Sequence, residues 1–259
     1  MARKIQLAVD IGRRAVRVAK IRSGRRTTLA ATLFETIPSQ VDAEDPVAVG
    51  SMLAESMARA GIDPGPAVFA LDRSITSLKR LTLPTDDPDE LPDMVRLAVE
   101  RELPIDAEDA VIDFSILDRS SDGFLVETVA VPRREIERIE RIAEAAGMRV
   151  ARVAPRCHGA MRLADSTEPT LVLDVTGEGF ELGLVDHGRL RWSRGVSIEG
   201  ADPGGPTAEE LVPEIRRSWL SYRVSAGEIE TPMLLILGGE QIADVVGGIS
   251  EATGLTAQR

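Results

Sequence analysis

"LAVDIGRRAVRVAKI", residues 7–21, is the stretch that decides the fold. An apolar strand ends in Asp10-Ile11-Gly12, two arginines follow, and the alternation of apolar and polar residues then resumes at once. Such a corner predicts either a plain β-hairpin or a loop whose backbone N–H groups meet a phosphate. An isolated Asp-x-Gly corner is more often a hairpin, so the choice depends on the rest of the chain.

The same pattern occurs again in the second half of the chain. Residues 170–188, TLVLDVTGEGFELGLVDHG, contain an apolar strand, Asp174, Gly177, a further strand and a glycine turn. A repeated unit of this kind predicts two similar subdomains that face each other. Glycine corners on both sides of a cleft let backbone N–H groups approach a phosphate chain, and Asp10 and Asp174 would then hold the bridging metal ion.

The composition predicts a folded protein and excludes several classes of partner. The chain has 259 residues, of which 43% are hydrophobic, enough for a substantial core. An aromatic content of only 3% and a net charge of -11 argue against nucleic acid. The single cysteine, Cys157, excludes an internal disulfide framework and gives no metal cluster. The apolar run MLLIL at 233–237 is too short to span a bilayer, so we expect a cytoplasmic protein that reaches membranes through a partner.

The order of the expected elements divides the chain into three parts. Residues 1–77 read as a β-meander, a helix and a strand, which we expect to form the first subdomain. Residues 78–155 read as an α+β module of its own, and its second helix covers 133–147. Residues 156–259 contain the second Asp-Gly corner and are expected to form the second subdomain.

A glycine pair near the C-terminus favours a nucleotide site over two plain hairpins. An apolar strand ends in Gly238-Gly239, and a helix is expected from about Glu240. Two glycines at a strand end let an adenine or a ribose lie flat against the backbone, because no Cβ stands in the way.

The helix upstream of that strand carries a polar stripe. The spacing of Glu214, Arg217 and Ser221 places them on one side of an α-helix. A carboxylate, a guanidinium and a hydroxyl in this row would grip a nucleoside. The alternative is a helix that packs through Ile215 and Trp219 and whose polar face is simply solvated.

The chain resembles the actin-like ATPase superfamily in the order of its motifs. These are the first corner, the α+β module, the second corner, the Glu-x-x-Arg helix and the Gly-Gly strand end. The segments LAVDIGRRAVRVAKI, LVLDVTGEGFELGLVDHGRLRWSRGVSIEG, EIRRSWLSY and LLILGGEQ look like those of the type IV pilus assembly protein PilM family, in the FtsA-like branch of that superfamily. The resemblance implies an α/β fold with two actin-like (ribonuclease H-like) subdomains, 1–77 (1A-like) and 156–259 (2A-like), and the small α+β module 78–155 (1C-like) inserted between them. The second lobe is expected to be reduced, with its 2B-like part largely missing, because the connection after Gly195 is short and rich in Gly and Pro.

The resemblance also implies a site for ATP and Mg²⁺. Its first phosphate loop would contain Asp10, Gly12, Arg13 and Arg14. The other residues that the resemblance implies are Asp174, Thr176 and Gly177 in the second phosphate loop and Glu214, Arg217, Gly238, Gly239 and Glu240 around the nucleoside, with Asp10 and Asp174 at the metal. Family members usually have small hydroxyl residues after Asp-x-Gly, so Arg13 and Arg14 either neutralise phosphate charge or fill the site.

For function, the resemblance implies a cytoplasmic scaffold, peripheral to the inner membrane, in the assembly of type IV pili or related secretion machinery. In the family, such a protein docks the N-terminal peptide of a membrane-anchored partner of the PilN type, and self-association is also expected. ATP binding is expected to be weak or lost and hydrolysis slow or absent, because neither His158 nor His187 is a convincing general base. The alternatives are an active actin-like-fold ATPase or small-molecule kinase, and the cytoplasmic domain of a type II secretion component.

Overall fold

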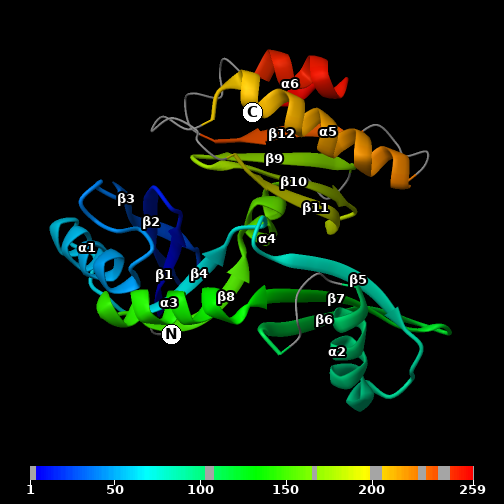
Figure 1. Ribbon diagram of the computed structural model, residues 1–259, viewed down its shortest axis with the longest axis horizontal. Helices are drawn as coiled ribbons and strands as arrows, with labels where there is room; N and C mark the ends of the chain where they lie inside the picture. The colour runs from blue at the N-terminus through cyan, green and yellow to red at the C-terminus, as the bar shows by residue number, and fades with distance from the viewer. Residues whose placement is uncertain are drawn as a thin grey trace.

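Three β-sheets organise the molecule into two lobes and a smaller module, as Figure 1 shows. The computed structural model describes residues 4–102, 108–164, 168–198, 206–226, 232–238 and 246–258. The strand orders are β3-β2-β1-β4-β8 in the first lobe, β11-β10-β9-β12-β13 in the second lobe and β5-β7-β6 in the module. When the strands of each lobe are numbered along the chain, both sheets have the spatial order third, second, first, fourth, fifth. The predicted internal duplication is therefore confirmed. None of the helices in these ranges is long and apolar enough to cross a membrane.

The first lobe is a five-stranded sheet with two helices on one face. Its elements are β1 (Lys4–Ile11), β2 (Ala15–Ser23), β3 (Thr28–Thr36), α1 (Pro46–Arg59), β4 (Pro66–Leu71), α3 (Arg133–Ala145) and β8 (Arg149–Pro155). The first three strands are antiparallel, whereas β4 and β8 run parallel to β1. Asp45 caps α1 by accepting a hydrogen bond of 2.9 Å from the N–H of Val47, and Gly61, at φ 66°, follows the helix end.

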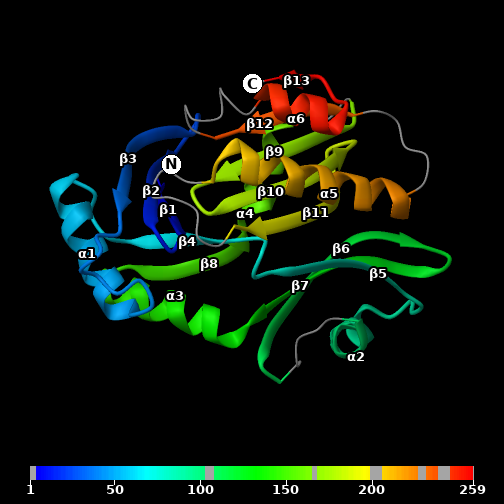
Figure 2. The same cartoon turned by 45° about the horizontal axis from the view of Figure 1, so that its top comes forward.

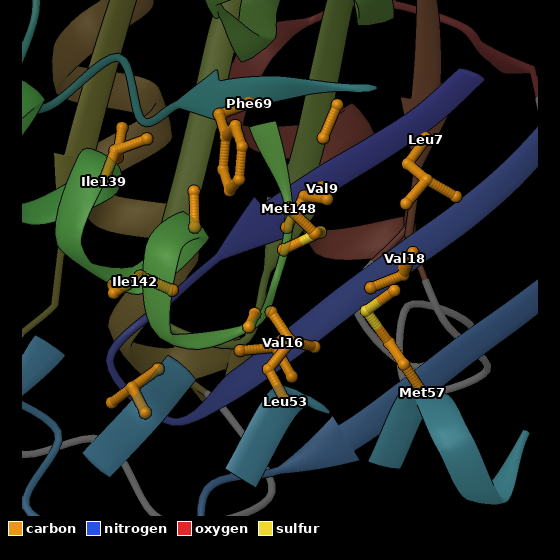
Figure 3. Close-up of a cluster of buried hydrophobic side chains, with 14 of the residues drawn as sticks. Leu7, Val9, Val16, Val18, Leu53, Met57, Phe69, Ile139, Ile142 and Met148 are labelled. Carbon is orange, nitrogen blue, oxygen red and sulfur yellow. The ribbon is translucent and has the colours of Figure 1, made fainter. Parts of the chain in front are cut away.

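Alternation along the strands directs one set of side chains to these helices. Leu7 and Val9 of β1 and Phe69 of β4 are buried against α1 and α3, and Figure 3 shows them beside Ile139 and Ile142 of α3. The residues between them in sequence, such as Ala8 and Asp10, lie on the opposite face. Among the described residues, no helix of the first lobe packs on this opposite face.

The position of α3 and β8 corrects the grouping expected from the sequence. Residues 133–155 were expected in the inserted module, but β8 pairs with β4, and α3 packs against α1 with Ile142 and Ala143 buried in the first-lobe core. The apolar stripe of α3 suits either sheet, so its sequence does not select one. The division into 1–77, 78–155 and 156–259 as separate folding units stays a prediction.

The module consists of β5 (Ser77–Leu83), the 3-10 turn η1 (Pro88–Glu90), α2 (Leu91–Glu102), β6 (Ala110–Ser120) and β7 (Gly123–Pro132). Its three strands are antiparallel, with β7 in the centre. Leu91, Val95 and Val99 of α2 pack on Phe124 and Val126 of β7, so the module has a small core of its own.

The second lobe repeats the sheet but covers it on both faces. Its elements are β9 (Thr170–Thr176), β10 (Gly179–Asp186), β11 (Arg189–Ser197), α5 (Ala208–Ala226), β12 (Met233–Leu237), α6 (Val246–Thr253) and β13 (Ala257–Gln258). Leu171 and Leu173 of β9 pack toward α5 and α6, whereas Val172 packs toward the linking helix α4 (Arg156–Ala160) and the 3-10 turn η2 (Met161–Leu163). The continuous apolar run of β9 is explained by this double covering.

The linking helix α4 lies where the three parts of the molecule meet, as both views show (Figure 1, Figure 2). It follows β8 of the first lobe directly and leads into β9 of the second. The predicted turn after β10 is confirmed, with His187 at φ 48° and Gly188 at φ 70°. The chain thus brings the ends of β1, β4, β8 and β9 toward one inter-lobe cleft.

Candidate functional site

The two glycine corners face each other across that cleft. In the first corner, the N–H of Gly12 donates to the carbonyl of Ala15 at 2.9 Å and closes a tight turn. The carboxylate of Glu178, from the second corner, accepts hydrogen bonds from the backbone N–H groups of Arg13 and Arg14, the latter at 3.1 Å. A Cβ added to Gly12 would lie 2.5 Å from Oε1 of Glu178, so a larger residue here would displace the Glu178 carboxylate from this position.

A single guanidinium, that of Arg156 at the start of α4, links four carboxylates in the cleft. Its Nη1 lies 3.2 Å from Asp10 Oδ1, and its Nη2 lies 2.7 Å from Asp72 Oδ2 and 2.9 Å from Glu181 Oε1. Its Nε is 3.9 Å from Asp174 Oδ2. Asp10 lies near the end of β1 and Asp72 follows β4 in the first lobe, whereas Asp174 and Glu181 belong to β9 and β10 of the second, so Arg156 bridges the lobes.

Burial and the neighbouring charges shift the pKa values of these groups. Burial lowers the pKa of Arg156, but Glu181, Asp10, Asp72 and Asp174 together raise it above its usual value. Burial raises the pKa of Glu181 to about 7, although Arg156 opposes the shift, and it also raises the pKa of Asp174. The cleft therefore contains more carboxylates than the one guanidinium can fully compensate.

A second arginine anchors the loop after β4 to the second lobe. The backbone N–H of Arg73 donates to Glu181 at 2.8 Å, and its side chain donates to the hydroxyl and the carbonyl of Ser193 at 2.8 and 3.1 Å. Gly195 on β11 lies so close to Arg73 and Ser74 that a Cβ there would overlap their backbone. The lobes are thus in direct backbone contact beside the cleft.

The structure brings some of the predicted site residues together and separates others. Asp10, Gly12, Arg13 and Arg14 form the first corner, and the hydroxyl of Thr176 accepts from the N–H of Glu178 at 3.3 Å in the second. Gly177 has open space around its Cα, and Gly238 follows Leu237, which pairs with Asp174. Glu214 and Arg217 form an ion pair of 2.8 Å on α5, with Ile215 and Trp219 buried beneath, and their role at a nucleoside stays a prediction. Gly239 and Glu240 lie outside the described residues.

Four important residues of the cleft were missed by the sequence reasoning. They are Asp72, Arg156, Glu178 and Glu181. A signal existed for the first two, since Asp72 and Arg156 each follow an apolar strand directly, as Asp10 does. Arg13 and Arg14 were expected either to neutralise phosphate charge or to fill the site. The side chain of Arg13 is exposed, and the guanidinium among the carboxylates is that of Arg156.

A long groove opens from the cleft across the uncovered face of the first-lobe sheet. It has a volume of about 1490 Å³ and is bounded by the first lobe, the module, α4 and the adjoining strands of the second lobe. The side chains that give it an apolar floor and wall include Ala8, Ala19, Val68, Val111, Phe114 and Leu163. Two strands at sheet edges, β6 and β8, contribute to its sides.

Charged groups line the same groove where the module meets α4. Oε2 of Glu127 lies 3.1 Å from Nε2 of His158, and its Oε1 lies 3.7 Å from Nε of Arg80. Burial alone raises the pKa of Glu127, but His158 and Arg80 outweigh it, and the pKa is lowered. This carboxylate is therefore negative at neutral pH and fixes the junction between module and helix.

Comparison with solved structures identifies the fold. A PilM-PilN type IV pilus biogenesis complex matches 97% of this chain and 87% of its own, at a TM-score of 0.82 and 19% sequence identity. A Bacteroides thetaiotaomicron protein with an actin-like ATPase fold matches 98% of this chain and 90% of its own, at a TM-score of 0.57 and 9% identity. The chain has the actin-like ATPase fold.

A secretion protein shares this fold with the chain. The cytoplasmic domain of EpsL, an inner-membrane component of the type II secretion system of Vibrio cholerae, matches 92% of this chain and 87% of its own, at a TM-score of 0.59 and 16% identity. Neither protein-family models nor curated protein sequences give a match. The fold shared with the PilM-PilN complex and with the EpsL domain supports the family resemblance expected from the sequence.

The fold implies ATP and Mg²⁺, but the residues in this cleft do not fit them. The backbone N–H groups that would donate to a phosphate already donate to the carboxylate of Glu178. The carboxylates that a cation would need already surround Arg156. Among the described residues, no group of His, Cys, Asp or Glu side chains is close enough to hold a metal ion.

Proposed function

We propose that the protein is an actin-like scaffold in the assembly of type IV pili or a related secretion machine, and that it docks a peptide of a membrane-anchored partner. The partner is a PilN-like inner-membrane protein, whose N-terminal cytoplasmic segment binds in the groove. The scaffold is cytoplasmic and reaches the inner membrane through this partner. ATP binding is weak or lost, and self-association stays a prediction.

The observation that carries this proposal is the groove of about 1490 Å³. Its floor is the face of the first-lobe sheet opposite α1 and α3, with Ala8, Ala19 and Val68 half-buried. Small apolar side chains leave room for an extended chain and give it surface to bury. The similarity to a PilM-PilN complex supports the choice of partner.

The sheet edges supply a way to hold such a peptide. Because β8 is the last strand of the first-lobe sheet and β6 the last strand of the module sheet, each presents backbone groups along one side. An extended peptide in the groove pairs with such an edge and places alternate side chains in pockets. Phe114 and Leu163 stand along the groove as candidate contacts for apolar side chains of the peptide.

A binding experiment with a groove-filling substitution tests the proposal. The labelled N-terminal peptide of the PilN-like partner is titrated with the full chain, and binding is followed by fluorescence polarisation. Ala19 lies on the groove face of β2, so Ala19→Arg places a long charged side chain in the groove without entering the core. We expect at least roughly tenfold weaker binding, the effect of losing about 1.4 kcal/mol of contact.

The matched control is Ala58→Arg on the exposed side of α1, away from the groove. This variant is expected to bind the peptide as the unmodified chain does. Equal binding by Ala19→Arg would contradict docking in the groove. ATP turnover by the unmodified chain would instead favour the alternative, an active ATPase or kinase of the same fold.

A further inference from the structure

The first corner has the form of an anion site, and its anion is part of the chain. The N–H groups of Arg13 and Arg14 converge on one oxygen of Glu178, and Gly12 leaves the space that this oxygen occupies. Successive backbone N–H groups in such a turn favour negative charge. The carboxylate of Glu178 thus stands where a phosphate oxygen would be bound.

The cation that pairs with the cleft carboxylates also belongs to the chain, because it is the guanidinium of Arg156. Arg156 contacts Asp10 and Asp72 from the first lobe and Asp174 and Glu181 from the second. A divalent ion bridging these groups would compete with a guanidinium that four carboxylates already surround, and Arg156 cannot be deprotonated to make way for it.

The two internal ligands cross the gap between the lobes. Glu178 reaches from the second lobe to the first, and Arg156, from the linking helix, contacts both. In a nucleotide-dependent cleft, the ligand itself supplies such bridges, so the closed state depends on its concentration. Here the bridges are covalently attached to the chain and are always present.

We propose that Glu178 and Arg156 take the places of the phosphate and the metal ion, so that this protein holds its lobes closed by itself and excludes Mg·ATP. The cleft is a permanent structural lock. The partner groove on the first lobe consequently has one fixed shape that nucleotide does not alter. Peptide docking is measured by a separate titration, so a failure of docking and a failure of the lock give different results.

The first part of the test uses the unmodified chain. Calorimetry and thermal unfolding are carried out with Mg²⁺ and ATP at concentrations up to several millimolar. We expect no heat of binding and no shift in Tm. Saturable binding of Mg·ATP with a dissociation constant below about 1 mM would overturn the proposal, because a filled cleft leaves no site of that affinity.

The second part of the test removes the side chains of Glu178 and Arg156, one at a time. Glu178→Ala is expected to increase hydrogen exchange at the amides of residues 13 and 14 by roughly tenfold or more, whereas Glu178→Gln, which keeps an acceptor, restores part of the protection. Arg156→Met is expected to lower Tm by roughly 10 °C, because it leaves buried carboxylates unpaired. If Arg156→Met fails to fold, the exchange measurement on the half-buried Glu178 still decides.

Matched controls come from a surface ion pair that does not line the groove or contact either corner. Arg59 and Glu35 are 3.2 Å apart on the surface of the first lobe, so Arg59→Ala and Glu35→Ala remove the same charges without touching either corner. Both are expected to change Tm by no more than roughly 2 °C and to leave exchange at residues 13 and 14 unchanged. Unchanged amide exchange in Glu178→Ala would overturn the lock.

Discussion

The two lobes share one strand order but differ in what covers their sheets. In the first lobe, α1 and α3 bury one face, and Ala8 and Val68 on the other face line the groove. In the second lobe, α5 and α6 cover one face, and α4 with η2 covers the other, so Val172 is fully buried. Two sheets with the same strand order thus differ in covering, and the sheet with one uncovered face supplies the proposed docking surface.

The lobes also differ where their first two strands meet the cleft. Across the first-lobe ladder, Asp10 lies opposite Arg17, and the two are 3.1 Å apart. Across the second-lobe ladder, Asp174 lies opposite Glu181, a second carboxylate. Like charges in a cross-strand pair destabilise a sheet. The second lobe therefore depends on Arg156, which lies outside both of its strands.

The largest expected effect tests the difference in covering. Val172 on β9 and Val68 on β4 lie on the corresponding faces of the two sheets, one buried under α4 and one at the groove. Val172→Ala should lower the free energy of unfolding by roughly 2 to 3 kcal/mol, because it removes two methyl groups from a packed core and leaves a cavity. Val68→Ala should cost roughly 1 kcal/mol or less. Urea unfolding measures both, and equal losses would mean that the two faces are equally covered.

A smaller effect tests the edges. β3 and β11 occupy the same place in the two sheets, but Leu29 and Phe34 of β3 are exposed, whereas Gly195 of β11 contacts the loop at Arg73. Gly195→Ala should destabilise the protein by roughly 2 kcal/mol, since the new methyl group overlaps backbone that cannot easily move.

Gly247 on α6 serves as the control, because nothing lies within 4 Å of a Cβ added there. Gly247→Ala is expected to be neutral or to stabilise by roughly 0.5 to 1 kcal/mol, as alanine suits a helix better than glycine does. The same urea titration applies. Loss of stability in both variants would argue against a specific contact between the lobes at Gly195.

The smallest expected effect is the pH dependence of the second-lobe carboxylate pair. Burial raises the pKa of Glu181 from 4.5 to about 7, although Arg156 and the N–H of Arg73 oppose the shift while Asp72 and Asp174 add to it. The folded protein then binds the proton more tightly than the unfolded chain. The stability contributed by this protonation is full below about pH 4.5 and is lost as pH rises through about 7.

Glu181→Gln removes that titration. Between pH 5 and 8, the unmodified chain should lose roughly 1 to 2 kcal/mol more of its free energy of unfolding than Glu181→Gln does. Thermal unfolding across this range measures the difference. Parallel pH profiles of the two proteins would show that folding does not raise the pKa of Glu181.

The sequence by itself determined the repeated corners, their facing arrangement and the fold class, because strand periodicity and an Asp-x-Gly ending are local patterns that a second copy makes specific. It also marked Asp10 and Asp174 as cleft residues. It placed 133–155 in the wrong sheet, since the apolar stripe of α3 fits any apolar face of suitable size. Only the tertiary structure decided that Arg156 and Glu178 fill the cleft and that one sheet face stays open, because charges and surfaces from distant segments choose their partners by position in space, and no local pattern encodes that position.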